Sequence, residues 1–322
     1  MLTHLGEIQK IKTAIDGAQK ILLIGHQKPD GDALGALIAM AYFLKQNRKD
    51  YALFCLDQPS VQYEFLPLLH EVGFNPKIFK EKFDLVIVLD SGDLTYAGVD
   101  QLLPQPKNYT LINIDHHASN AFFGDINLVL PTLSSVSEII YHLLRLWHSP
   151  INKEMATALL NGVIFDTGSF SNAATSLSVL EASSHLLNLG ARHKTINDNM
   201  LRNKSLGLLK LWGRAFERLQ YNPKYHLAFT IITAQDLLDC DVATDASVGL
   251  SNYFNELAGA KIIMVLTELP NGFIKGSLRT THDDVDVAQM AKQWGGGGHR
   301  KAAGFTIPGK LVYNEGKWQI IE

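Results

Sequence analysis

The sequence lacks the features of secreted and membrane-inserted proteins. Cys55 and Cys240 are its only cysteines, too few for a disulfide framework or a thiolate metal site. Its longest apolar runs fall far short of the ~20 residues that cross a bilayer. Charged residues at helical spacing interrupt the first segment, so no apolar signal core is present there. These absences predict a cytoplasmic protein with reduced thiols and no membrane partner.

An excess of charge of one sign is also absent. The chain has 29 Lys and Arg against 32 Asp and Glu, a formal net charge of −3. A long polyanion would therefore meet no broad electrostatic attraction. We expect no long nucleic acid as a partner, and any nucleic acid substrate should be short.

Length and hydrophobic patterning predict an α/β protein. The 322 residues, 46% of them hydrophobic, suffice for about two domains with separate cores. Apolar strand-like runs alternate with amphipathic helical stretches, which is typical of a mostly parallel sheet with flanking helices. We predict a first domain over residues 1–190, a helical linker over 191–221, and a smaller α/β domain with a mixed sheet over 222–322. The active-site cleft is expected between the two domains.

Local signals place the individual elements. Ser135 and Glu138 fit a capping box that begins a helix, and a turn at 270–272 predicts a hairpin between the strands on either side of it. Strands are expected at 21–24, 85–89, 111–114, 227–232, 262–266 and 273–278, and helices at 33–44, 139–147, 156–166, 177–189 and 287–294.

Metal-binding residue types follow three of the predicted strands. His26, Asp30 and Asp32 form an H-x-x-x-D-x-D pattern after the first strand, Asp90 ends the second, and Asp115-His116-His117 ends the third. The carboxyl ends of parallel strands meet at one edge of a sheet, where open α/β folds bind ligands. Asp166, which ends a helix, adds a further carboxylate.

A cluster of this kind requires cations. Neighbouring carboxylates repel one another and would take up protons unless metal ions neutralise them, so we expect two divalent ions. Oxygen and imidazole ligands without thiolate favour Mn²⁺, with Mg²⁺, Co²⁺ or Zn²⁺ as alternatives. Taken singly, an Asp at a strand end is more often a helix cap and a His more often a surface residue. The ordered set of motifs favours the metal site.

These residues, in order, resemble the four motifs of the DHH phosphoesterase family, and the glycine run at 295–298 resembles its C-terminal associated domain. The resemblance covers nearly the whole chain and is strongest to bacterial nanoRNases that also dephosphorylate 3′-phosphoadenosine 5′-phosphate (pAp). It implies that His26 and Asp30 hold one metal, that Asp32 and His116 hold the other, and that Asp90 bridges them while Asp166 completes the site. It further implies attack by a metal-bridged hydroxide, with His117 orienting the phosphate and protonating the leaving oxygen. Asp115 is expected to buttress the adjacent backbone and His116.

The second domain supplies the candidate substrate-binding residues. Consecutive glycines allow positive backbone angles and could form a nest of N–H groups for a phosphate, with His299 at its rim. Alternatively, Gly295 caps a helix and the other glycines form a mobile loop. Arg279 could grip a terminal phosphate through its planar guanidinium, or it could be an exposed arginine at a strand end. The predicted set is Arg279, Gly296, Gly297, Gly298 and His299.

The resulting prediction is a metal-dependent phosphoesterase that hydrolyses short oligoribonucleotides (nanoRNA) to mononucleotides, and pAp to AMP. A cyclic-di-AMP or pApA phosphodiesterase is an alternative, and a non-catalytic nucleotide sensor is an alternative of another class. An inorganic pyrophosphatase and a processive single-strand exonuclease fit less well, because the first would need a basic second domain and the second additional domains. The resemblance also makes a homodimer a possible assembly.

Overall fold

The computed structural model describes residues 4–200, 204–242, 248–254, 257, 259–314 and 316–321. The chain divides into two compact units, Met1–Asn203 and Lys204–Glu322. The boundary lies inside the stretch 191–221 that the sequence suggested as a linker. The helices of that stretch belong one to each unit, since Ile196 is buried in the first core and Leu211 in the second.

The first unit is built on a six-stranded parallel sheet of order β3-β2-β1-β4-β5-β6. Its three central strands are buried almost throughout, because both faces of the sheet are covered. The strands are β1 (Lys20–Ile24), β2 (Asp50–Phe54), β3 (Val72–Gly73), β4 (Leu85–Leu89), β5 (Thr110–Asp115) and β6 (Ile126–Val129).

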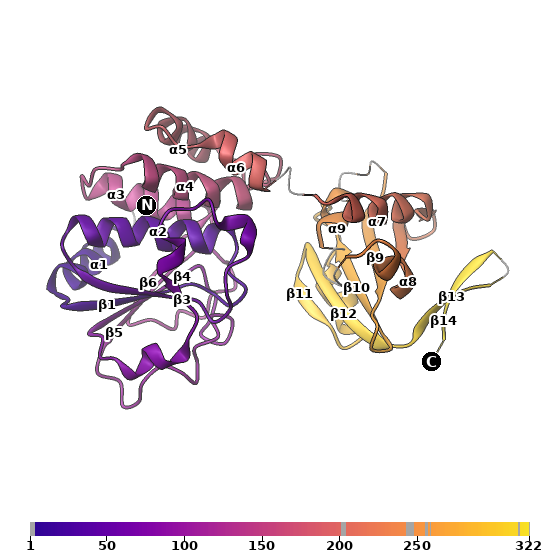
Figure 1. Cartoon of the computed structure of the whole chain (residues 1–322), viewed down its shortest axis with the longest axis horizontal. Coiled ribbons are helices and arrows are strands. Elements are labelled where there is room, and N and C mark those ends of the chain that lie inside the picture. Colours follow the sequence, from indigo (N-terminus) through magenta and orange to yellow (C-terminus); the bar gives the residue numbers. More distant parts are fainter. Residues whose placement is uncertain are drawn as a thin grey trace. The chain divides into compact units, whose positions relative to one another are not determined.

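Helices cover one face of this sheet, and irregular loops with the 3₁₀ turn η4 cover the other (Figure 1). Helix α2 is buried over most of its length beneath α4, and the two cross closely at Gly162. A Cβ at Gly162 would lie 2.0 Å from Ser137 Oγ, so only glycine fits there. The helices are α1 (Leu5–Gly17), α2 (Gly31–Gln46), α3 (Val136–Leu146), α4 (Lys153–Asp166), α5 (Leu177–Asn188) and α6 (His193–Met200), and the 3₁₀ turns are η2 (Val61–Tyr63), η3 (Leu69–Glu71) and η4 (Pro76–Lys80).

The second unit contains a mixed sheet of order β11-β12-β10-β9-β8-β7, in which only the β8–β9 pair is parallel among the described strands. One core packs α7, α8 and α9 on the sheet, and another packs α10 on it. The helices are α7 (Leu206–Glu217), α8 (Ala234–Asp239), α9 (Val248–Phe254) and α10 (Val287–Lys292). The strands are β7 (Gln220–Asn222), β8 (Leu227–Ile232), β9 (Ile262–Glu268), β10 (Phe273–Arg279), β11 (Gly297–His299), β12 (Ala302–Pro308), β13 (Lys310–Asn314) and β14 (Lys317–Ile321).

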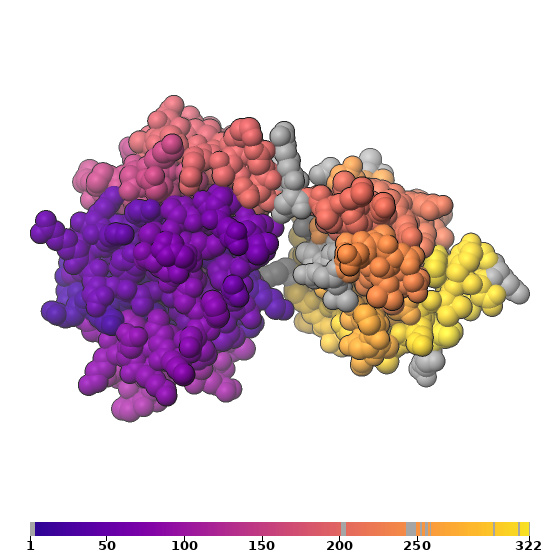
Figure 2. All heavy atoms as spheres, viewed as in Figure 1, coloured from indigo at the N-terminus to yellow at the C-terminus, as the bar shows by residue number. Residues whose placement is uncertain are grey.

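The last two strands pair with each other and stand out at the edge of their unit (Figures 1 and 2). The fold class predicted from the sequence is confirmed, with a parallel first sheet and a smaller unit with a mixed sheet. Both cysteines are free and buried. None of the helices in the described ranges combines the length and the apolar character of a membrane span.

The predicted capping box at α3 is only half formed. Ser135 Oγ accepts a hydrogen bond of 3.0 Å from the Glu138 N–H, as expected. The Glu138 carboxylate, however, accepts its bond from Ser134 N–H rather than from Ser135 N–H. A complete capping box occurs instead at the start of α8, between Thr233 and Asp236.

Candidate metal centre

The functional side chains gather at the carboxyl ends of three neighbouring strands. Strands β1, β4 and β5 lie side by side and in parallel, so their following residues reach the same edge of the sheet. His26 follows β1, Asp90 follows β4, and His116 follows β5. The topology therefore brings together groups that are far apart in the sequence.

Asp30 is shared between a helix cap and the site. As N-cap of α2, its Oδ1 accepts hydrogen bonds from the N–H groups of Asp32 and Ala33, at 2.9 and 3.1 Å. Its other oxygen, Oδ2, lies 3.5 Å from His26 Nε2. The capping interaction thus turns the second oxygen towards the imidazole.

Asp32 is fully buried and fixed by the start of α3. Its Oδ2 accepts a hydrogen bond of 2.6 Å from Val136 N–H, and its Oδ1 accepts one of 2.8 Å from Ser137 N–H. Burial first, and then the charge of Asp30, raise the pKa of Asp32 to about 6, although hydrogen bonds from Ser137 and Val136 act in the opposite direction.

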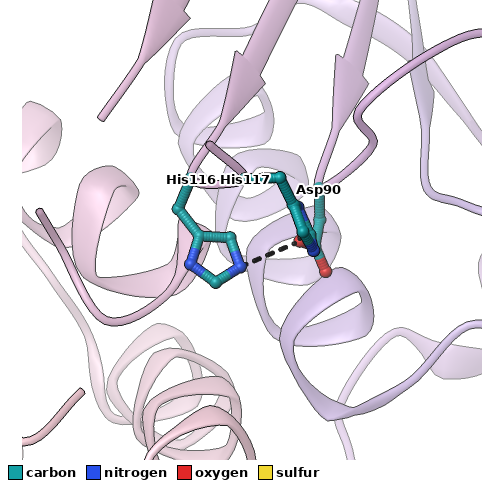
Figure 3. A group of neighbouring side chains, drawn as sticks. All are labelled: Asp90, His116 and His117. Carbon is teal, nitrogen blue, oxygen red and sulfur yellow. Dashed lines mark ion pairs between the residues drawn. The ribbon is translucent and has the colours of Figure 1, made fainter. Parts of the chain in front are cut away.

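Asp90 lies between two histidines. Its Oδ2 is 3.6 Å from His26 Nε2, and its Oδ1 is 3.6 Å from His116 Nε2. Figure 3 shows His116 pointing at Asp90 beside His117. Asp90 has a φ of +59°, a left-handed conformation that is strained for a residue other than glycine and often marks functional positions. Burial first, and then the charge of Asp32, raises the pKa of Asp90 to about 6.

Asp166, the last residue of α4, completes the group. Its Oδ2 lies 3.3 Å from His116 Nε2. Burial and the charges of Asp32 and Asp90 raise the pKa of Asp166 well above its usual range. Three sets of donor atoms lie close enough to share a cation. They are His26, Asp30 and Asp90; Asp32, His116 and Asp166; and Asp90, His116 and His117.

The Asp115 side chain bonds His117, whereas the sequence predicts support of the adjacent backbone and His116. His117 Nδ1 lies 2.8 Å from Asp115 Oδ1 and donates to it. This bond raises the pKa of His117, and it lowers the pKa of Asp115 although burial acts in the other direction. The imidazole is therefore fixed through Nδ1, and this bond sets the direction of Nε2.

These residues fit divalent cations. Within the part of the chain that the structure describes, Asp90 Oδ1 and Asp166 Oδ2 are buried oxygens without a hydrogen-bond partner, although buried polar atoms are almost always paired. Both belong to carboxyl groups whose pKa is raised by burial and by like charge, so positive charge is what the site lacks. Carboxylate oxygens and imidazole nitrogens together suit Mn²⁺ and related ions.

The cavity beside these groups has a volume of about 310 Å³. It is lined by His26, Asp30, Asp90, His116, His117 and Asp166, which were predicted, and by Tyr96, Pro131, Leu133, Ser134 and Ala174, which were not. The centroid of the Tyr96 ring lies 5.0 Å from that of the His26 ring. It lies in an irregular loop after β4, and its sequence context gave no signal of this position.

The candidate substrate residues at 296–299 do not form the loop that the alternative interpretation gave them. Gly297, Gly298 and His299 form β11 and pair with β12, while the Gly296 N–H donates to Ala291 O at the end of α10. Gly295 has a φ of +71° and donates its N–H to Lys292 O, as in the capping alternative. The side chain of His299 lies outside what the structure describes.

Arg279 ends β10 and is half-buried, with Nη1 donating to Leu278 O. Burial lowers the pKa of this guanidinium. It is thus not the exposed arginine of the alternative interpretation. Its role as a phosphate ligand stays a prediction.

Comparison with known proteins agrees with the site. The DHH family N-terminal domain matches residues 20–163, and the DHHA1 domain matches residues 229–317. The chain therefore carries a DHH family N-terminal domain and a DHHA1 domain, and it is by class a hydrolase.

Several relatives have names that describe activities. The bifunctional oligoribonuclease and PAP phosphatase NrnA of Thermus thermophilus is 28% identical over 304 residues, 94% of this chain and 88% of that protein. The cyclic-di-AMP phosphodiesterase PdeA of Listeria monocytogenes is 24% identical over 93% of this chain, but over only 46% of its own length. An exopolyphosphatase-related protein from Bacteroides fragilis shares the fold, with a TM-score of 0.87 at 24% identity over 94% of this chain and 91% of that one.

Proposed function

We propose that this protein hydrolyses short oligoribonucleotides to mononucleotides and pAp to AMP, with two divalent cations, most readily Mn²⁺. The observation that carries the proposal is the position of Asp90, whose two carboxylate oxygens face His26 on one side and His116 on the other. A carboxylate shared by two donor sets is what a pair of cations requires. The relative from Thermus thermophilus, which matches over most of both chains, carries both activities in its name.

Two of the three donor sets would each hold one cation. His26 and Asp30 would bind the first, His116, Asp32 and Asp166 the second, and Asp90 both. When bound, the cations would activate a water molecule and neutralise phosphate charge. In the reaction a bond forms between the water oxygen and phosphorus, and the bond between phosphorus and the leaving oxygen breaks.

His117 would supply the proton that the leaving oxygen needs. Its Nδ1 is held by Asp115, so Nε2 carries the mobile proton. The raised pKa of His117 keeps more of the imidazole protonated near neutral pH than an isolated histidine would be. A nucleoside alkoxide is a poor leaving group, and protonation at the oxygen as it departs lowers that barrier.

The second unit would bind the rest of the nucleotide. The proposed contacts are Arg279, Gly297, Gly298 and His299. The Gly296 N–H already donates to Ala291 O, and a Cβ at Gly296 would lie 2.2 Å from Gly304 O, so Gly296 would contribute by letting the chain pack closely on β12 beside the other proposed contacts. A binding site that accommodates only a few nucleotides agrees with the near balance of positive and negative charge in the chain.

A cyclic-di-AMP or pApA phosphodiesterase is the second candidate. One relative is named a cyclic-di-AMP phosphodiesterase, and this favours the second candidate. The match covers less than half of that relative's length. A non-catalytic sensor is disfavoured by the geometry, because every predicted metal ligand lies in the cluster. The cytoplasmic location and a homodimeric assembly stay predictions.

A substrate panel tests the proposal. The purified chain, supplied with Mn²⁺, is incubated with an RNA dinucleotide, a 20-mer RNA, pAp, pApA and cyclic di-AMP, and Asp90→Ala serves as the inactive control. We expect turnover of the dinucleotide and pAp, and slower turnover of the 20-mer. Equal or faster cleavage of the 20-mer would contradict the length limit, and exclusive cleavage of cyclic di-AMP or pApA would favour the second candidate.

A further inference from the structure

We infer that Asn120 is a positioning residue for the reaction, which orients His117 through Asp115 without touching the substrate. The inference rests on the proposed function, since it concerns how the leaving oxygen is protonated. Asn120 lies three residues after His117 in the loop between β5 and β6, and its side chain is buried.

The amide of Asn120 is fixed in one orientation. Its Oδ1 accepts a hydrogen bond of 2.7 Å from Phe122 N–H, so the oxygen must point to the backbone. Its Nδ2 faces three acceptors, which are Asp115 Oδ2 at 2.6 Å, Asn113 Oδ1 at 3.0 Å and Ser91 O at 3.1 Å. An amide turned by 180° would set oxygen against these three oxygens, which would be repulsive.

Through this amide, Asn120 fixes the carboxylate that holds His117. The two oxygens of Asp115 have different partners, with Oδ1 on His117 Nδ1 and Oδ2 on Asn120 Nδ2. Without the amide, a fully buried carboxylate oxygen would lose its donor, and the carboxylate could rotate away from His117. The direction of His117 Nε2 would then no longer be fixed.

The metal ligands have separate support. Ser91, which follows Asp90, has its carbonyl oxygen bound by Asn113 Nδ2 at 3.1 Å as well as by Asn120. Asp90 N–H is held by Ile114 O in the neighbouring strand. Loss of the Asn120 side chain should therefore leave Asp90 in place and cation binding intact, while it releases His117.

A misplaced general acid has a recognisable kinetic signature. Protonation of the leaving oxygen matters greatly when the leaving group is a ribose hydroxyl and little when it is p-nitrophenolate, which departs readily without a proton. Asn120→Leu removes the amide donor and keeps a similar shape. We expect it to lower kcat for an RNA dinucleotide by about 10–100-fold, the range seen when a supporting residue is removed. The kcat for thymidine 5′-(p-nitrophenyl phosphate) should change by less than about threefold.

The controls separate positioning from general damage. Asn127, in β6, exchanges two hydrogen bonds with Gly124 of the preceding loop. It is not among the residues that line the cavity, so Asn127→Ala should leave the ratio of the two kcat values unchanged. Manganese content by elemental analysis should be the same in the wild type, Asn120→Leu and Asn127→Ala. Asn120→Ser, which is smaller and cannot overpack the loop, gives the same comparison if the leucine variant folds poorly.

A double mutant gives a second test of the positioning role. Because both residues act on one proton transfer, Asn120→Leu combined with His117→Ala should be no slower on the dinucleotide than His117→Ala alone. Equal losses on the two substrates, or full activity of Asn120→Leu on the dinucleotide, would overturn the positioning role. A wild type inactive on both substrates would instead contradict the proposed function, so the two failures are distinguishable.

Discussion

Asp32 accepts a 2.6 Å hydrogen bond from the N–H of Val136, the first residue of α3, so one carboxylate both satisfies an N–H group at the start of this helix and belongs to the candidate metal site. The same side chain accepts a second bond from Ser137 N–H, and it stands with His116 and Asp166 in one donor set. Because the charge that would bind a cation also stabilises the helix N-terminus, stability and function depend on the same group.

Replacing Asp32 should therefore cost stability as well as activity. Asp32→Ala leaves two buried N–H groups without an acceptor, and we expect the free energy of unfolding to fall by roughly 2–4 kcal/mol. Urea unfolding in the presence of EDTA measures this without the contribution of the metal. Asp57 accepts a bond from Lys28 N–H at the surface, so Asp57→Ala should cost less than about 1 kcal/mol. Equal losses in the two variants would show that the Asp32 contacts add little.

Asp90→Ala should nearly abolish hydrolysis, because its carboxylate faces both histidine-containing donor sets. We expect kcat on an RNA dinucleotide to fall by more than about 100-fold, beyond the range for a supporting residue. Bound Mn²⁺ per chain, measured by elemental analysis after gel filtration, should also fall. Activity close to that of the wild type would exclude a mechanism with two cations that share Asp90.

Cation binding should stabilise the first unit more strongly at high pH. The folded-state pKa values of Asp32 and Asp90 are raised to about 6, first by burial, above the value of about 4 in an unfolded chain. Ionisation of these two groups therefore destabilises the metal-free fold as pH rises through about 4 to 6, and protonation restores that stability as pH falls. A cation binds the ionised form and competes with protons, so its effect grows with pH.

Thermal unfolding with Mn²⁺ and with EDTA checks this dependence at pH 8 and pH 5.5. At 100 times the dissociation constant, a cation adds about 2.7 kcal/mol to stability. We expect a clear rise in the midpoint at pH 8 and a much smaller one at pH 5.5, with both reduced in Asp90→Ala. A shift of the same size at both pH values would contradict the assignment of these carboxylates as ligands.

Gly162 is required where α4 passes α3 and Asp32. A Cβ there would lie 2.0 Å from Ser137 Oγ and 2.6 Å from Asp32 Oδ1, both on buried residues. Gly162→Ala should therefore destabilise the protein by about 1–3 kcal/mol through overpacking, and lower Mn²⁺ affinity because Asp32 must move.

Gly213 provides the matched control for this substitution. It lies in α7, and no atom of the described residues outside its own helix turn would come within 4 Å of a Cβ added there. Gly213→Ala should stabilise the second unit by about 0.5–1 kcal/mol, since alanine is the better helix former. Urea unfolding monitored by circular dichroism distinguishes the two, and a stabilised Gly162→Ala would refute the packing argument.

Much of the site could be predicted from the sequence because its chemistry lies in short motifs at strand ends. His26, Asp30 and Asp32 occur within seven residues, and Asp115, His116 and His117 are consecutive. Apolar runs marked β1, β4 and β5, and the rule that parallel strands end at a common edge then placed these groups together. Division of the chain between two units was also expected, and the boundary at 203/204 falls inside the predicted linker stretch, whose helices belong one to each unit.

Contacts between distant residues could not be predicted in this way. Tyr96 beside His26, the bonds from α3 to Asp32, and the choice of His117 over His116 as the partner of Asp115 have no local signature. Likewise, the glycines at 297 and 298 have the composition of a loop, but pairing with β12 makes them a strand.

The sequence by itself determined which groups could bind cations and which strand ends carry them, because residue type and the periodicity of apolar residues are local properties. Only the tertiary structure decided which oxygen of Asp90 faces which histidine, and that Asn120 holds Asp115. Those relationships depend on the positions of side-chain atoms to within about 1 Å. Close packing against elements far away in the chain sets these positions.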